Sequence, residues 1–117
     1  MAGGFDAKKA CEVIDYADAK ERFGGNEALF RKLADKYAED PHYENLVQAL
    51  ARDNAQAAYQ EAHALKGVAG NLSFSALYEA AAKASDALRE GDAQTARALL
   101  PELREAHKAV LAALEGF

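Results

Sequence analysis

The sequence has few of the residues that build disulfides and metal sites. Its 117 residues include one cysteine, Cys11, two prolines and no tryptophan. A single thiol cannot close an internal disulfide, and no paired cysteines with the spacing of a zinc site are present. We therefore interpret Cys11 as a small apolar helix residue and predict no metal site.

Long apolar runs are also missing. No stretch of about 20 apolar residues occurs, so we expect no membrane-spanning helix. The N-terminus, MAGGFDAKK, lacks the apolar segment of a signal peptide, and Ala2 does not fit the myristoylation pattern. These absences predict a cytoplasmic protein that makes no membrane contact.

Positive charge is in the minority, with 14 Lys and Arg against 19 Asp and Glu and a net charge of -5. Nucleic-acid binding depends on cationic surface that displaces counterions, so we expect no nucleic-acid partner. Half of the residues are apolar and 28% are charged, which is typical of a globular chain. A chain of this length supports one hydrophobic core, so we predict a single domain over residues 1–117, with residues 1–5 flexible.

The remaining pattern is helical throughout. Side chains that cap helices precede the apolar periodic stretches, glycines follow them, and no strand-like alternation occurs. The predicted helices span residues 6–23 (in one or two pieces, capped by Asp6 and Asp15), 27–39, 42–51, 54–71, 75–90 and 93–114. The alternative caps are Asp53 or Asn54 for the 54–71 helix and Ser73 or Ser75 for the 75–90 helix. Pro101 removes one backbone hydrogen bond and is expected to bend the last helix near residues 97–101.

Short turns between these helices make consecutive helices antiparallel neighbours. Apolar residues at positions 55, 58, 62, 65, 69 and 72 repeat at intervals of three and four, which is typical of the seam of a bundle. The predicted fold is all-α: an antiparallel four-helix bundle with the 6–23 segment as an additional N-terminal helical cover.

The stretch HALKGVAGNL, residues 63–72, stands out because it places two glycines in a predicted helix. Each costs about 1 kcal/mol relative to alanine. Residues three, four and seven positions from His63 share its helix face. They are Tyr59, Lys66, Gly67 and Gly70. An accessible imidazole beside an ammonium, with side chains missing on the approach, suits the acceptance of a phosphoryl group from another protein.

The other two histidines lack such neighbours. His42 follows Pro41 at a helix start, so we expect it to be a surface residue. His107 lies between Glu105 and Lys108 and is expected to have a structural role only.

The stretch HALKGVAGNL resembles the phosphoacceptor motif of histidine-containing phosphotransfer (HPt) domains, typically His-x-Leu-Lys-Gly followed by small residues. RFGGNEALFRKLADKYAED, residues 22–40, resembles the segment before the motif helix in that family. ALREGD, residues 87–92, resembles its usual turn between helices. The resemblance covers residues 15–114.

The resemblance implies a phosphorelay carrier without independent kinase activity. His63 would accept a phosphoryl group on Nε2 from a receiver-domain aspartate and pass it to another receiver. Lys66 would assist electrostatically, and Tyr59, Gly67 and Gly70 would give the receiver access. The partners would be receiver domains of response regulators or hybrid histidine kinases. Magnesium would belong to the receiver, so the chain, expected to be a monomer, needs no cofactor.

Two positions depart from the family pattern. Ser73 stands where many members have glycine, so the turn there is expected to differ. Some members use a long polar residue on the next helix to hold the histidine ring. The antiparallel partner of His63 falls near residues 83–86, where Lys83 and Ser85 are the candidates for orienting Nδ1.

Other functions fit less well. Gly67-Val-Ala-Gly70 fits the GxxG loop of KH domains, but that loop needs strands around it. Histidine kinase dimerisation domains carry an acidic residue after the phosphorylated histidine, where this chain has Ala64. No HExxH, paired-histidine or serine-nucleophile motif supports a hydrolytic enzyme. The alternative to a carrier is an interaction-only helical bundle, a degenerate phosphotransfer domain.

Overall fold

The computed structural model describes residues 13–116. The predicted flexible segment 1–5, the cap Asp6 and Cys11 lie outside the described residues. The described chain forms helices joined by short turns, with no strand between residues 13 and 116. The elements are α1 (Tyr16–Arg22), α2 (Glu27–Asp35), the 3-10 helix η2 (Lys36–Glu39), α3 (His42–Ala51), α4 (Ala55–Asn71), α5 (Ser75–Arg89), α6 (Ala93–Ala98) and α7 (Leu100–Glu115).

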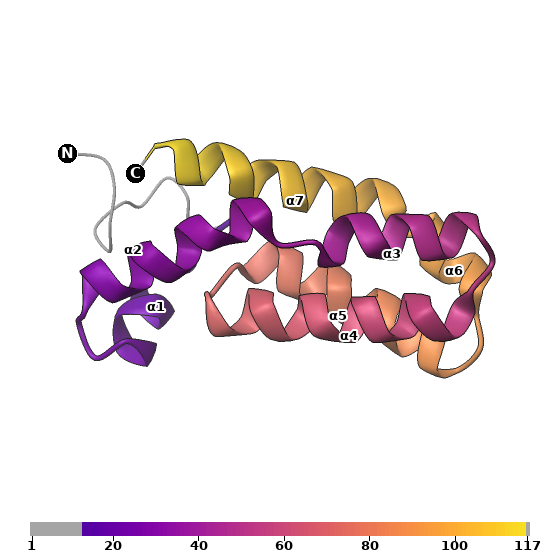
Figure 1. Cartoon of the computed structure of the whole chain (residues 1–117). Helices are drawn as coiled ribbons and strands as arrows, with labels where there is room; N and C mark the ends of the chain where they lie inside the picture. The colour runs from indigo at the N-terminus through magenta and orange to yellow at the C-terminus, as the bar shows by residue number, and fades with distance from the viewer. Residues whose placement is uncertain (1–12, 117) are drawn as a thin grey trace.

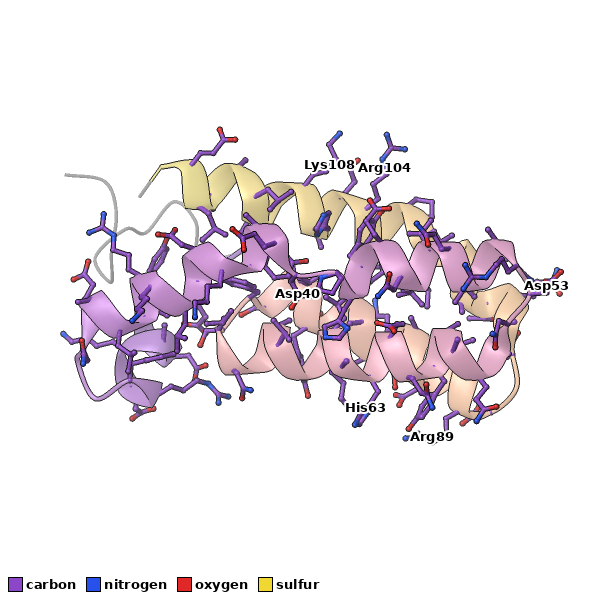
Figure 2. The ribbon with its side chains drawn as sticks, viewed as in Figure 1. Asp40, Asp53, His63, Arg89, Arg104 and Lys108 are labelled. Carbon is purple, nitrogen blue, oxygen red and sulfur yellow. The ribbon has the colours of Figure 1, made fainter. Side chains whose placement is uncertain are left out.

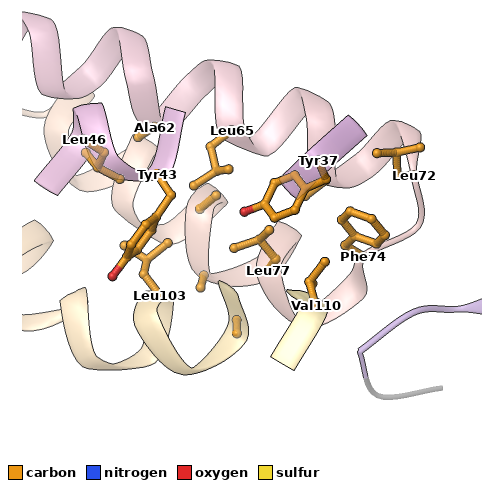
Figure 3. Packing of buried hydrophobic residues seen from close by; sticks show 14 of the residues in the cluster. Tyr37, Tyr43, Leu46, Ala62, Leu65, Leu72, Phe74, Leu77, Leu103 and Val110 are labelled. Atoms are coloured by element: carbon orange, nitrogen blue, oxygen red, sulfur yellow. The ribbon is translucent and has the colours of Figure 1, made fainter. Parts of the chain in front are cut away.

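The helices form an all-α bundle, as the sequence predicts (Figure 1). α2 and α3 follow each other along one side, and α4, α5 and α7 complete the bundle. Apolar side chains from four helices face one another in its core (Figure 3). They include Leu46, Leu65, Leu77 and Leu103, all fully buried. Six of the ten buried residues of α4 and α5 are alanines, whose small side chains allow two helices to pack closely.

The α4 seam shows how the sequence pattern sets the orientation of this helix. Ala58, Ala62, Leu65 and Ala69 have no exposed surface, so they mark the side of α4 that faces the bundle core. Residues on the opposite side of the same turns must face solvent, because successive residues are about 100° apart around a helix.

Capping side chains begin four of the helices. Each cap oxygen accepts a hydrogen bond from the backbone N–H three residues later, at 3.0–3.1 Å. The caps are Asp15, Asn26, Asn54 and Asp92. Asn54 is therefore the cap of α4, and the alternative, Asp53, has a left-handed backbone with φ +56°.

The predicted serine caps of α5 are wrong. Phe74 occupies the cap position and makes no side-chain cap bond, while Ser75 is already helical. Ser73 has a left-handed backbone, with φ +59°, and its hydroxyl donates to Asp18 Oδ2 at 2.7 Å instead. The backbone N–H of Asp15 donates to the Ser73 carbonyl at 2.7 Å. These two bonds fasten α1, the predicted N-terminal cover, to the α4–α5 turn.

The predicted bend at Pro101 is a break between two helices. α6 ends at Ala98, Leu99 forms a turn, and α7 starts at Leu100. Pro101 thus lies in the first turn of α7, where its missing N–H leaves no bond unmade. Among residues 13–116, no helix is both long and apolar enough to cross a membrane.

Candidate functional site

His63 projects from α4 into solvent, away from the bundle core (Figure 2). Its neighbours in sequence and along the seam, Ala62 and Leu65, are fully buried. In Figure 2 the imidazole lies on the side of the molecule opposite Arg104 and Lys108 of α7. The exposure expected of a side chain that a second protein must reach is confirmed.

The phenol ring of Tyr59 stacks on the His63 imidazole. Their centroids are 5.9 Å apart, with an angle of 26° between the planes. Tyr59 lies one turn earlier on α4 and is half-buried, so its ring has support from the bundle. Neither nitrogen of His63 has a hydrogen-bond partner within the described chain. The stack places the phenol beside one face of the imidazole.

The two glycines on this face have different surroundings. A Cβ added to Gly67 would meet no atom within 4 Å, so this position opens onto free space. A Cβ added to Gly70 would come within 3.2 Å of the Tyr78 ring, which packs against the helix there. Gly67 therefore faces open space one turn after His63, whereas Gly70 accommodates a side chain of α5.

Lys66 supplies positive charge one turn after His63. The residue is half-buried, and its ammonium forms no ion pair with a carboxylate of residues 13–116. On α5, Lys83 is paired with Glu102 of α7 at 3.2 Å and Arg89 with Asp86 at 3.1 Å. The ammonium of Lys66 is thus available to an incoming anion.

The structure does not bring the two candidate ring-orienting residues to His63. Ser85 is 1% exposed and lies among the buried residues of α5, while His63 points into solvent. Lys83 Nζ is 3.2 Å from Glu102 Oε2 of α7 and is held there. Neither side chain hydrogen-bonds the imidazole. The ring contact observed within residues 13–116 is the stack with Tyr59.

The other histidines are occupied by structural partners. His42 Nδ1 lies 2.8 Å from Glu61 Oε1, and the side chain is half-buried rather than fully at the surface. His107 Nδ1 lies 2.6 Å from the hydroxyl of Tyr37, and the imidazole stacks on Tyr43 with centroids 4.1 Å apart. Burial lowers the pKa of His107. The structural role predicted for His107 is confirmed by these contacts.

Tyr78 is a residue of this face that sequence reasoning missed. It is 42% exposed, and its ring lies against Gly70. The available signal was the tight α4–α5 turn, which places the first turn of α5 opposite the last turn of α4. No cluster of three or more potential metal ligands occurs in the part of the chain described by the structure.

Comparison with known proteins gives one match. The family model described as the Hpt domain matches residues 38–113. This span includes the exposed histidine and extends from η2 into α7. No curated protein and no solved structure matches the chain.

Proposed function

The chain belongs to the Hpt domain family, the phosphotransfer domains of two-component systems, and we propose that His63 is its phosphoacceptor. The observation that carries this proposal is an exposed imidazole with both nitrogens free beside the open space at Gly67. His107 and His42 are less suitable because each is half-buried and holds a partner through Nδ1.

In the proposed step, the lone pair of Nε2 on His63 attacks the phosphorus of a receiver's aspartyl phosphate. The N–P bond forms while the P–O bond to the aspartate breaks, and its electron pair returns to the aspartate carboxylate. The imidazole keeps its proton on Nδ1, which faces no protein acceptor within residues 13–116. The reverse step passes the phosphoryl group to the aspartate of another receiver.

Lys66 and Gly67 support this step in different ways. A phosphorylated side chain carries about -1.5 to -2 charges near neutral pH, which the free ammonium of Lys66 can partly offset. The absent side chain at Gly67 lets the receiver backbone come close to the imidazole. In this proposal the chain is a monomeric cytoplasmic carrier, a single domain over residues 1–117, without kinase activity of its own.

Incubation with a phosphorylated receiver domain tests the proposal. The chain is expected to gain an acid-labile phosphate that maps to His63, and His63→Gln should gain none. His42→Gln is the matched control, because it removes a histidine outside the site and should label like the wild type. Labelling of His63→Gln would place the acceptor elsewhere.

The alternative function, an interaction-only bundle, gives a different result. Such a chain would bind the receiver without taking up phosphate. Labelling of the purified chain by ATP alone would contradict a carrier that depends on a phosphorylated donor.

A further inference from the structure

Tyr78 is an exposed aromatic residue on the same face of the molecule as His63. It lies in the first turn of α5, and 42% of its surface is exposed. Its ring atoms come within 3.2 and 3.3 Å of the position that a Cβ at Gly70 would take. The ring therefore lies across α4 where Gly70 leaves room for it.

Gly70 is seven residues after His63, which is close to two full turns of α4. Its missing side chain would point within about 20° of the His63 direction, roughly 10 Å further along the helix axis. The ring that fills this position thus extends the acceptor face. Gly67, with nothing within 4 Å of its Cβ position, leaves open space between the imidazole and the Tyr78 ring.

A pocket of about 220 Å³ lies beside the Tyr78 ring. Its apolar lining includes Ala69 and Phe74, which are fully buried, and its polar lining includes Arg22 and Asp18 of α1. The α1 residues are held in place, because Asp18 Oδ2 accepts bonds from Arg22 Nε and Ser73 Oγ, both at 2.7 Å. Both bonds lower the pKa of Asp18, so its carboxylate stays charged near neutral pH.

A protein that docks on His63 with an interface of ordinary size would also cover Tyr78. Such an interface covers about 800 Å² on each partner, a patch of roughly 16 Å radius. A receiver centred on His63 would therefore cover the Tyr78 ring. A few residues carry most of the binding energy of an interface, and tyrosine is enriched among them.

We propose that Tyr78 and the pocket beside it form a second anchor for the receiver domain, which inserts an apolar side chain there while its aspartate faces His63. The identity of the partner rests on the proposed function. Among residues 13–116, the other large exposed apolar side chains are Leu29 and Leu33, which lie on α2. Tyr78 thus determines how tightly the receiver binds, and His63 determines whether the phosphoryl group moves.

Equilibrium binding separates these two roles. Purified unphosphorylated receiver domains from the source genome are titrated against the chain, and the tightest binder serves as the probe. Tyr78→Ala should raise the Kd about tenfold, the loss expected of an interface anchor. Tyr78→Phe, which keeps the ring, should stay within about twofold of the wild type. Leu29→Ala is the matched control, because Leu29 is 43% exposed, almost the same as Tyr78.

The same titration in a His63→Gln background tests docking without chemistry and should show the same loss for Tyr78→Ala. Backbone amide signals of Arg22, Gly70 and Ser73 should shift on receiver addition, while that of Leu29 should not. Equal Kd values for Tyr78→Ala and Leu29→Ala, or no binding by any receiver, would overturn the anchor. Transfer to His63 with an unchanged Kd in Tyr78→Ala would overturn the anchor and leave the carrier function standing. A tenfold loss of binding in a chain that takes up no phosphate would support the anchor and refute the carrier.

Discussion

The Tyr37 hydroxyl and His107 Nδ1 lie 2.6 Å apart, although 70 positions separate these residues in the sequence. The contact joins η2 to α7, and the ring of Tyr43 stacks on the same imidazole. Burial raises the pKa of Tyr37 and lowers the pKa of His107, so both are neutral at pH 7. His107, a neutral histidine between two tyrosines, therefore links η2 and α3 to α7.

This linkage predicts a loss of stability in mild acid. The pKa of His107 is lower in the folded chain than in the unfolded chain, where it is about 6.5. The unfolded state then binds more protons, so the contribution of His107 is complete above about pH 6.5 and is lost as the pH falls below that value. Urea unfolding at pH 7.5 and 5.5 measures this loss. His107→Phe, which keeps an aromatic ring on Tyr43, should lose less stability over the same interval.

Titration of Asp18 and Asp92 does not contribute to the difference in stability between pH 7.5 and pH 5.5. Hydrogen bonds lower the pKa of each carboxyl below its ordinary value, so both remain charged at pH 5.5. Identical pH dependence in the wild type and His107→Phe would show that His107 does not titrate with folding.

Tyr59 is expected to hold the His63 ring in position for transfer. Aromatic pairs contribute about 0.5–1.5 kcal/mol beyond the area they bury, which corresponds to about two- to tenfold in rate if the stack orients the imidazole. Tyr59→Leu should slow transfer from a saturating phosphorylated receiver by that factor and remove the ring-current shift of the His63 proton signals. Tyr59→Phe keeps the stack and should match the wild type in both measurements. An unchanged transfer rate in Tyr59→Leu would show that the stack does not orient the imidazole for transfer.

The parts of this structure that depend on neighbours in sequence were predictable. The four side-chain caps follow from residue type and position, and the exposure of His63 follows from the spacing of the buried residues Ala62 and Leu65 on α4. The break at Leu99 was placed correctly but interpreted as a bend, because the apolar spacing continues through it.

Contacts between distant segments were not predictable in the same way. Ser73 was one of the two expected caps of α5, yet its hydroxyl donates to Asp18, 55 positions earlier in the sequence. The Tyr78 ring on Gly70 was missed because nothing in a single helix reveals what fills a glycine's missing side chain. Ser85 looked available to His63 by antiparallel register alone, but that register does not show that the side chain is buried.

At Ser73, backbone strain and a side-chain hydrogen bond have opposite effects on the free energy of unfolding. A left-handed backbone costs a residue with a side chain about 1–2 kcal/mol, and a bond to a carboxylate contributes about 1.5–3 kcal/mol. Ser73→Ala keeps the strain and loses the bond, so it should lower the free energy of unfolding by about 1.5–3 kcal/mol. Ser73→Gly loses the bond but relieves the strain, and should be about 1 kcal/mol more stable than Ser73→Ala. Chemical denaturation of both variants measures the difference. A glycine variant no more stable than the alanine variant would contradict the strain at Ser73.

Lys66 is expected to influence the phosphorylated state only modestly. Exposed ion pairs contribute about 0–1 kcal/mol, so Lys66→Ala should shorten the phosphohistidine lifetime or slow transfer by no more than about fivefold. The thermal melt should stay unchanged, since Lys66 has no ion-pair partner in residues 13–116. Lys83→Ala is the matched control, because Lys83 is engaged with Glu102. Equal lifetimes in the wild type and Lys66→Ala would leave Lys66 without a role in the site.

Gly67 and Gly70 should respond differently to the same substitution. Gly67→Ala should raise the free energy of unfolding by about 0.5–1 kcal/mol, because alanine favours helix and its Cβ meets no neighbour. Gly67→Gln should keep most of that gain while greatly reducing transfer, since its side chain would occupy the approach to His63.

Gly70→Ala has the same helix preference, but its Cβ would come within 3.2 Å of the Tyr78 ring and displace it. It should therefore be less stable than Gly67→Ala and should weaken receiver binding, as we expect for Tyr78→Ala. Thermal melts and receiver titrations of the three variants test this pattern. A loss of stability in Gly67→Ala would show that another part of the chain packs against Gly67, and receiver binding unchanged in Gly70→Ala would show that the position of the Tyr78 ring does not matter for docking.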